Sequence, residues 1–269
     1  MSNVGASYWI CSAPRSGSTW LCDSLALAGV AGRPGEHFSA SATPVEGGPQ
    51  EELGALNGLL GEVHRKGSGA NGVVGTKVLW SQCVPLLARM RKALGRNGLA
   101  DAQVLDAFLP GLRFVWLRRA DKLRQAISLS RAVESRVWWR RDAEAPAAGM
   151  AQPPDLMSDE QELRQWVQRI DVYRAMLQRD DEGWRAFFRS ALLTPLVLDY
   201  EQLVHGHGRV VQELLHWLGF PQAAPSASSS LVKQGDLRSE ELVHAYLTAR
   251  RQYDPPRVDA YAGLMPRDA

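Results

Sequence analysis

The sequence predicts an α/β protein in which a central parallel sheet is covered by helices on both faces. Short apolar segments with strand character alternate along the chain with segments whose apolar residues recur at helical spacing. Hydrophobic residues make up 45% of the 269 residues, which is typical of a globular core and not of a disordered chain. The sequence contains no internal repeat, and strand-like segments occur on both sides of its longest Ala/Pro-rich stretch. We therefore expect a single domain over residues 1–269.

Four segments predict the strands of this sheet. Each is a short apolar run that begins and ends at polar residues, glycine or proline, as expected of a buried strand. The segments are 8–13 (YWICSA), 72–80 (GVVGTKVLW), 114–117 (FVWL) and 195–200 (PLVLDY).

Helices are predicted between and after these strands. The first carries Trp20, Leu21 and Leu25, with Ser18 or Thr19 as its N-cap. Further helices are expected over 51–66, 83–94, 121–140, 159–190, 210–218 and 240–251. Irregular segments are expected near 39–71, 143–157 and 221–230, and the Ala/Pro-rich second one is interpreted as a loop or lid.

Composition excludes several classes of function. Lys and Arg number 31 against 29 Asp and Glu, so a net charge of +2 argues against a polybasic coat for nucleic acid. No apolar run approaches the length of a membrane span. The first seven residues carry no Lys or Arg, and the apolar run behind them is too short for a signal peptide. A cytoplasmic protein without stable membrane insertion is the expectation.

No metal site is expected. The three cysteines, Cys11, Cys22 and Cys83, lack the C-x-x-C spacing of zinc sites, and an odd number does not suggest a disulfide framework. His205 and His207 form an H-x-H pair among glycines, with no cluster of carboxylates or cysteines beside them. We interpret this pair as part of a loop.

The turn between the first strand and the first helix, Pro14-Arg-Ser-Gly-Ser-Thr19, has the character of a phosphate cradle. A tight glycine-containing turn presents backbone N–H groups at a helix N-terminus, where the helix dipole and the hydroxyls favour an anion. The turn lacks the lysine-serine/threonine pair of a nucleoside-triphosphate P-loop. An ordinary βα turn is the alternative.

Positive charge is concentrated after the third strand. Residues 113–141 carry nine basic and two acidic side chains, a local net charge of +7. Arg118 and Arg119 directly follow the strand, at the sheet edge where α/β proteins bind ligands, and Ser128 lies on the next helix. Arginine forks suit phosphate oxygens. A solvated helix face is the alternative for most of the other basic residues.

Glu36 lies in the irregular segment after the first helix, in Gly-Arg-Pro-Gly-Glu36-His-Phe. A carboxylate that reaches the same sheet edge would accept a proton from a hydroxyl nucleophile. On its own, a solvated loop glutamate is the commoner situation.

Taken together, the motifs resemble sulfotransferases that use 3′-phosphoadenosine-5′-phosphosulfate (PAPS), and in particular the bacterial trehalose 2-sulfotransferase-like family. The first strand and turn resemble the 5′-phosphosulfate loop, residues 119–128 the 3′-phosphate motif, and residues 195–203 an L-x-x-x-Y-E-x-L strand. The segments 14–22, 29–38, 75–80 and 119–128 match that family in order, and 231–236 resembles a late cofactor-contacting loop.

The resemblance implies a P-loop-kinase-like sulfotransferase fold and assigns roles to residues. The 5′-phosphosulfate would be held by Arg15, Ser16, Gly17, Ser18 and Thr19. The 3′-phosphate would be held by Arg118, Arg119 and Ser128, and the late loop would contribute Lys233 and Gln234. The implied general base is Glu36, and Lys77 would face the same site.

The expected reaction is in-line transfer of a sulfuryl group from PAPS to a hydroxyl of a carbohydrate, glycolipid or natural product, without a metal. The product nucleotide would be 3′-phosphoadenosine-5′-phosphate. A nucleotide-dependent small-molecule kinase and a non-catalytic nucleotide-binding module are the alternatives. Trp138 and Trp139 form either an aromatic platform for the acceptor or a packed helix end or dimer interface. The resemblance further implies a homodimer.

Overall fold

The computed structural model describes residues 7–38, 46–96, 98–139, 160–224 and 237–252. The chain divides into two compact units. The first comprises Met1–Ala120 with Asp180–Ser229, and the second comprises Asp121–Arg179 with Ser230–Ala269. The single domain expected from the sequence over residues 1–269 stays a prediction.

The first unit contains a four-stranded sheet of order β2-β1-β3-β4, and every neighbouring pair is parallel. The strands are β1 (Ser7–Ser12), β2 (Val74–Leu79), β3 (Arg113–Arg118) and β4 (Leu196–Asp199). All four strands predicted from the sequence are confirmed, with bounds shifted by one or two residues. A parallel sheet with helices is therefore the observed architecture, as predicted.

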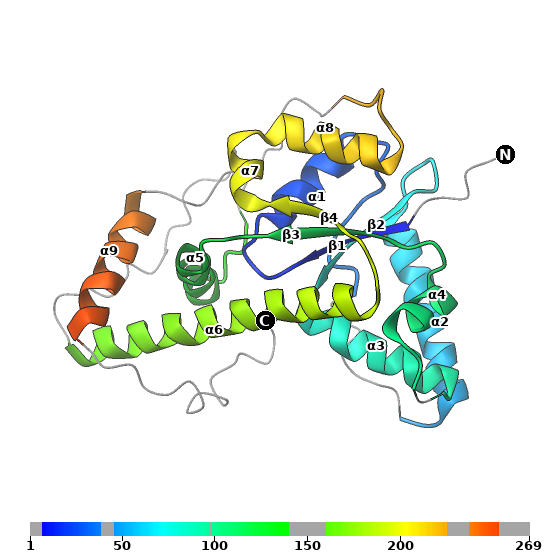
Figure 1. Cartoon of the computed structure of the whole chain (residues 1–269), viewed down its shortest axis with the longest axis horizontal. Helices are drawn as coiled ribbons and strands as arrows, with labels where there is room; N and C mark the ends of the chain where they lie inside the picture. The colour runs from blue at the N-terminus through cyan, green and yellow to red at the C-terminus, as the bar shows by residue number, and fades with distance from the viewer. Residues whose placement is uncertain (1–6, 39–45, 97, 140–159, 225–236, 253–269) are drawn as a thin grey trace. The chain divides into compact units, whose positions relative to one another are not determined.

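The two faces of the sheet have separate cores. Trp9 of β1 and Phe114 of β3 belong to one cluster of buried residues, whereas Ile10 and Val115 belong to the other. Because successive side chains of a strand point to opposite faces, this alternation places helices on both sides of the sheet. Figure 1 shows α1, α7 and α8 on one side, and α2, α3 and α4 on the other.

Six helices lie wholly within the described part of the first unit and cover these faces. They are α1 (Ser18–Leu27), α2 (Pro49–Gly67), α3 (Trp80–Leu94), α4 (Asp101–Phe108), α7 (Tyr200–His205) and α8 (His207–Leu218). α4 and α7 were not predicted. α2 confirms the helix predicted over 51–66 and extends it by two residues at the N-terminus and one at the C-terminus, so only the flanks of the segment 39–71 can be irregular. This helix contains glycines 54, 58 and 61, and it begins with a proline and an acidic first turn, both of which favour a helix start.

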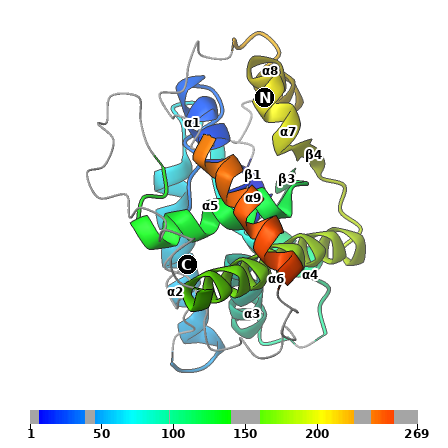
Figure 2. The ribbon, with the colours of Figure 1, turned by 90° about the vertical axis from the view of Figure 1, so that its left-hand side faces the viewer.

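The described part of the second unit is mainly helical. Its helices are α5 (Lys122–Ser135), the greater part of α6 (Glu160–Ser190) and α9 (Leu237–Gln252). α5 is shorter than predicted because the chain leaves the helix at Arg136, whose φ is +56°. α9 packs on α5, and Figure 2 shows the two helices crossing. The predicted loop or lid at 143–157 and residues 225–230 of the predicted loop at 221–230 lie outside the described residues.

The strand order determines where the chain can bind a ligand. β1 is followed by β2 on one side of the sheet and β3 by β4 on the other, so the connections leave the adjacent carboxyl ends of β1 and β3 in opposite directions. Such a switch point opens a crevice at the carboxyl edge of the sheet. The residues that follow β1, β2, β3 and β4 therefore meet at one edge.

Candidate active site

The turn after β1 adopts an unusual backbone conformation. Arg15 has φ +60° and Gly17 has φ +84°, both in the left-handed region. Gly17 is the N-cap of α1 and supplies no side-chain hydrogen bond, so the prediction of Ser18 or Thr19 as N-cap is wrong. A helix start without a side-chain cap leaves backbone N–H groups available to an anion.

Gly17 is required by its surroundings as well as by its φ angle. A Cβ atom built on Gly17 would lie 2.8 Å from Cδ2 of Tyr200, the first residue of α7. The Tyr200 ring therefore packs directly against the backbone of the turn. The end of β4 thus supports the turn that follows β1.

Two buried hydroxyls at this turn have no hydrogen-bond partner among the described residues. They are Oγ of Ser16, whose residue is 1% exposed, and Oγ of Ser12 at the end of β1. A buried hydroxyl without a partner is unfavourable unless a ligand completes its bonding. The residues present therefore fit the phosphate-bearing group that the sequence implies at this turn.

Lys77 connects the turn to Glu36. Its side chain is almost fully buried, and its Nζ donates to Oγ1 of Thr19 at 3.2 Å and forms an ion pair with Oε1 of Glu36. Thr19 lies in the first turn of α1 and Lys77 in β2. The structure therefore brings together three residues that come from three separate motifs of the sequence.

Arg118 and Arg119 have different surroundings. Arg118, at the end of β3, is bound to Asp199 at the end of β4 by two hydrogen bonds of 3.0 and 3.1 Å. Arg119 lies with its guanidinium 4.3 Å from the Tyr200 ring centroid and donates to the backbone carbonyl of Arg15 at 3.0 Å. Arg119 therefore contacts the turn, whereas Arg118 joins two strand ends.

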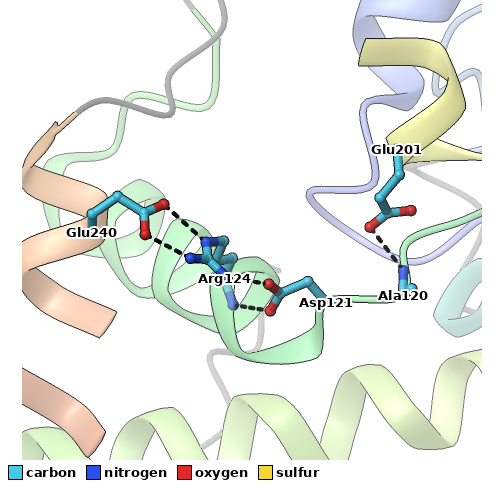
Figure 3. Close-up of polar contacts among 5 residues, drawn as sticks. All are labelled: Ala120, Asp121, Arg124, Glu201 and Glu240. Carbon is cyan, nitrogen blue, oxygen red and sulfur yellow. Dashed lines mark hydrogen bonds and ion pairs between the residues drawn. The ribbon is translucent and has the colours of Figure 1, made fainter. Parts of the chain in front are cut away.

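Glu201 supports the same region. Its Oε1 accepts a hydrogen bond of 3.1 Å from the backbone N–H of Ala120, the residue after Arg119 (Figure 3). Tyr200 and Glu201 are neighbours in the sequence, so one dipeptide at the end of β4 contacts both the Gly17 turn and the Arg119 turn. The sequence places this dipeptide in a motif but predicts neither contact.

Part of the positive charge predicted after β3 is bound by acidic side chains of the protein itself. Arg124 in the second unit binds Glu240 through Nε at 2.9 Å and Asp121 through a terminal nitrogen at 2.6 Å (Figure 3). These hydrogen bonds, first to Glu240 and then to Asp121, raise the pKa of Arg124. Arg113 lies over the Trp217 ring at 3.7 Å. The local charge of +7 therefore overstates the charge available to a ligand.

The remaining predicted site residues belong to the second unit or lie outside the described residues. Ser128 is half-buried on α5 and belongs to the second unit. Lys233 and Gln234 lie outside the described residues. Trp138 and Trp139 belong to the second unit, where their side chains are 40% and 49% exposed.

The buried cysteines are not activated nucleophiles. Burial raises the pKa of Cys22 to about 12, although the nearby Lys77 lowers it in part. Burial likewise raises the pKa of Cys11 and Cys83 well above that of a free thiol. All three are free thiols inside the first unit. The chemistry of the site therefore rests on its carboxylate, its cations and the turn after β1.

Comparison with known proteins identifies the family. The family model described as Stf0 sulphotransferase matches residues 7–249. The chain belongs to the Stf0 sulphotransferase family. It is accordingly a sulfuryl-transferring enzyme, as the motifs predicted, and neither the kinase nor the non-catalytic module.

Relatives of this Stf0 sulphotransferase cover almost its full length. The trehalose 2-sulfotransferase of Mycolicibacterium smegmatis is 32% identical, covering 91% of this chain and 96% of that protein. The trehalose 2-sulfotransferase of Mycobacterium tuberculosis is 29% identical with the same coverage. Among solved structures, a sulfotransferase from Alicyclobacillus acidocaldarius is 16% identical with a TM-score of 0.45, covering 92% of this chain and 93% of that one.

Two further findings concern the described part of this sulphotransferase. No group of three or more His, Cys, Asp or Glu residues is placed to hold a metal ion there. Within the same residues, none of the helices has both the length and the apolar character that crossing a bilayer requires.

Proposed function

We propose that the chain transfers a sulfuryl group from PAPS to a hydroxyl group of a carbohydrate, with Glu36 as the general base. The observation that carries this proposal is the Thr19–Lys77–Glu36 chain of contacts. It links a carboxylate to the first turn of α1, where an anion would bind. The relatives named trehalose 2-sulfotransferase support a sugar as the acceptor.

PAPS supplies an activated sulfuryl group attached to its 5′-phosphate. The residues that would hold the phosphosulfate are Arg15, Ser16, Gly17, Ser18 and Thr19, while Arg119, Ser128, Lys233 and Gln234 would hold the 3′-phosphate end. The unpartnered hydroxyl of Ser16 and the uncapped start of α1 support the first assignment. The second rests on the family resemblance and on the contact of Arg119 with the Arg15 carbonyl.

Side chains of the protein itself would accept the proton and stabilise the leaving group. Glu36 takes the proton of the acceptor hydroxyl while that oxygen bonds to sulfur and the bond from sulfur to the phosphate oxygen breaks. Arg15 and Lys77 would supply the positive charge that stabilises the leaving phosphate oxygen as it gains negative charge. No covalent intermediate with the protein is needed.

Labelled PAPS tests the proposal. The protein is incubated with trehalose and then with a panel of other sugars and glycolipids, and mass spectrometry identifies any sulfated product. We expect Glu36→Gln to lower kcat by about 10²- to 10⁴-fold, the range that general-base catalysis contributes. Glu213→Gln, at an exposed position of α8, is the matched control. Full activity of Glu36→Gln would remove the assignment of the base.

Binding measurements test the donor separately. Adenosine 3′,5′-bisphosphate should raise the unfolding temperature because it binds only the folded state, whereas Mg-ATP should not. Arg15→Ala should reduce this stabilisation. Stabilisation by Mg-ATP alone would contradict the use of PAPS.

The proposal includes a cytoplasmic homodimer of single-domain subunits. Three free, buried cysteines are in keeping with a reducing compartment. The homodimer rests on the family resemblance, and sedimentation equilibrium of the full chain tests it. A monomer at micromolar concentration would contradict it.

A further inference from the structure

Glu36 lies on a loop and not on a helix or strand. Its backbone is tied to the sheet, because Lys77 donates its N–H to the carbonyl of Gly35 at 2.8 Å. The backbone contact leaves the long Glu36 side chain able to rotate, and its side chain is 37% exposed. A general base must nevertheless point at the acceptor hydroxyl, so something has to orient this carboxylate.

Gln82 meets this need from α3. Its Nε2 donates to Oε2 of Glu36 at 3.3 Å, while the other carboxylate oxygen, Oε1, is paired with Lys77. The two oxygens of Glu36 are therefore held from two different elements, β2 and α3. Each oxygen keeps a second lone pair with which it can accept a proton.

The backbone fixes which way the Gln82 amide faces. Oε1 of Gln82 accepts a hydrogen bond of 3.0 Å from the N–H of Leu79, the N-cap residue of α3. A backbone N–H can only donate, so the carbonyl oxygen of the amide must face Leu79 and the NH₂ group must face Glu36. The hydrogen bond between Gln82 and the Leu79 N–H at the start of α3 thus presents a donor to the carboxylate.

We propose that Gln82 is a positioning residue for Glu36, which it orients by donating from an amide locked in place by the start of α3. This inference rests on the proposed function of Glu36 as general base. Gln82 acts through Glu36 and makes no contact with substrate in the proposal.

The variant Gln82→Glu separates orientation from helix capping. A glutamate at this position accepts from the Leu79 N–H as well as glutamine does, since it is the residue that capping boxes commonly use. It cannot donate to Glu36 when ionised. We expect kcat for sulfate transfer from labelled PAPS to fall about 10- to 100-fold. The unfolding temperature and the Kd for adenosine 3′,5′-bisphosphate should stay unchanged.

Gln103 provides a matched control. Its Oε1 accepts from the N–H of Ala100 at 3.0 Å in the same capping arrangement at the start of α4. Gln103→Glu therefore makes the same chemical change at a helix start that has no contact with Glu36. Its kcat should equal that of the wild type. Gln82→Met removes both donor and acceptor, and should lower kcat as Gln82→Glu does while also lowering stability.

Measuring the effect of Gln82→Glu in a protein that also carries Glu36→Gln distinguishes the failure of this inference from the failure of the proposed function. The assays use trehalose, or the acceptor that the sugar panel identifies. Adding Gln82→Glu to Glu36→Gln should cause no further loss if Gln82 acts only through Glu36. An inactive Glu36→Gln with a fully active Gln82→Glu would overturn the positioning role alone, as would fully additive losses. An active Glu36→Gln would overturn the base assignment and the positioning role with it.

Discussion

Arg118 and Asp199 join the ends of β3 and β4 through two hydrogen bonds of 3.0 and 3.1 Å. A bidentate pair of this kind fixes the planar guanidinium and uses two of its donor groups. Arg119, one residue later, lies instead over Tyr200 and against the turn after β1. Two adjacent arginines that look equivalent in the sequence therefore have different roles in the fold.

Replacing each arginine should separate these roles. We expect Arg119→Gln to weaken binding of adenosine 3′,5′-bisphosphate by about 10- to 100-fold, because a charged hydrogen bond contributes about 1.5–3 kcal/mol. Arg118→Gln should change the Kd less than about threefold and lower the free energy of unfolding by about 1 kcal/mol. Calorimetric titration measures the Kd, and chemical denaturation measures the free energy of unfolding. The assignment fails if Arg118→Gln weakens binding more than Arg119→Gln does.

The contact of Gly17 with Tyr200 makes a second prediction. Gly17→Ala introduces a Cβ atom 2.8 Å from the Tyr200 ring at a residue with φ +84°. Gly29 also has a positive φ, +75°, but a Cβ atom added there would meet nothing within 4 Å among the described residues. Gly29→Ala should therefore cost about 1–2 kcal/mol from backbone conformation alone. Gly17→Ala should cost more and should also weaken binding of adenosine 3′,5′-bisphosphate.

Thermal or chemical denaturation of the two alanine variants measures the difference. Equal losses of stability, with nucleotide affinity kept in both, would show that the ring of Tyr200 moves aside without consequence. A larger loss of stability for Gly17→Ala than for Gly29→Ala would indicate that the packing of Tyr200 holds the turn in place.

The strands could be predicted because each is an apolar run bounded by polar residues, whereas their order in the sheet could not. The short helices α4 and α7 could not, since eight and six residues contain too few turns to establish a helical period. The N-cap was misassigned because the left-handed conformation of Gly17 is a response to the whole turn. A serine or threonine nearby is otherwise the stronger N-cap signal.

The site could be predicted only as a set of separate residues. In the sequence alone, Glu36 is a weak candidate for the general base. Its contacts with Lys77 and Gln82, which lie far along the chain, strengthen that assignment. The pairing of Arg118 with Asp199 likewise joins residues 81 positions apart. Neither composition nor spacing encodes such contacts, because they depend on the order of the strands. The local charge of +7 was misleading because it leaves out Asp199 and Glu240, which lie outside residues 113–141 but bind Arg118 and Arg124.

His207 makes stability depend on pH. Its ring stacks on Trp20 with centroids 4.3 Å apart, and its Nε2 lies 2.8 Å from Oγ of Ser24. Burial lowers the pKa of His207 below its usual 6.5. Below pH 6.5 the unfolded chain therefore binds more protons than the folded one at this site, and the free energy of unfolding falls as the pH is lowered. The stability that the neutral His207 ring contributes to the folded state is fully present above pH 6.5.

Denaturation between pH 5 and 8 measures this dependence. His207→Gln should flatten the acidic part of the curve, and tryptophan fluorescence should change in parallel because of the Trp20 stack. His216→Gln, on the same helix, is the control. Parallel curves for wild type and His207→Gln would contradict the prediction.

The buried ion pair between α2 and α3 makes a prediction about stability alone. Glu52 is fully buried, and its carboxylate is bound by Arg89 Nε at 2.6 Å and lies 3.4 Å from Lys92 Nζ. Arg89→Met leaves this carboxylate with less compensation inside the core, so the free energy of unfolding should fall by about 3 kcal/mol. The double variant Glu52→Met/Arg89→Met should recover most of that loss, because Lys92 is partly exposed and its amine can reach water. Equal losses in the single and double variants, measured by urea denaturation, would instead assign the stability to side-chain packing.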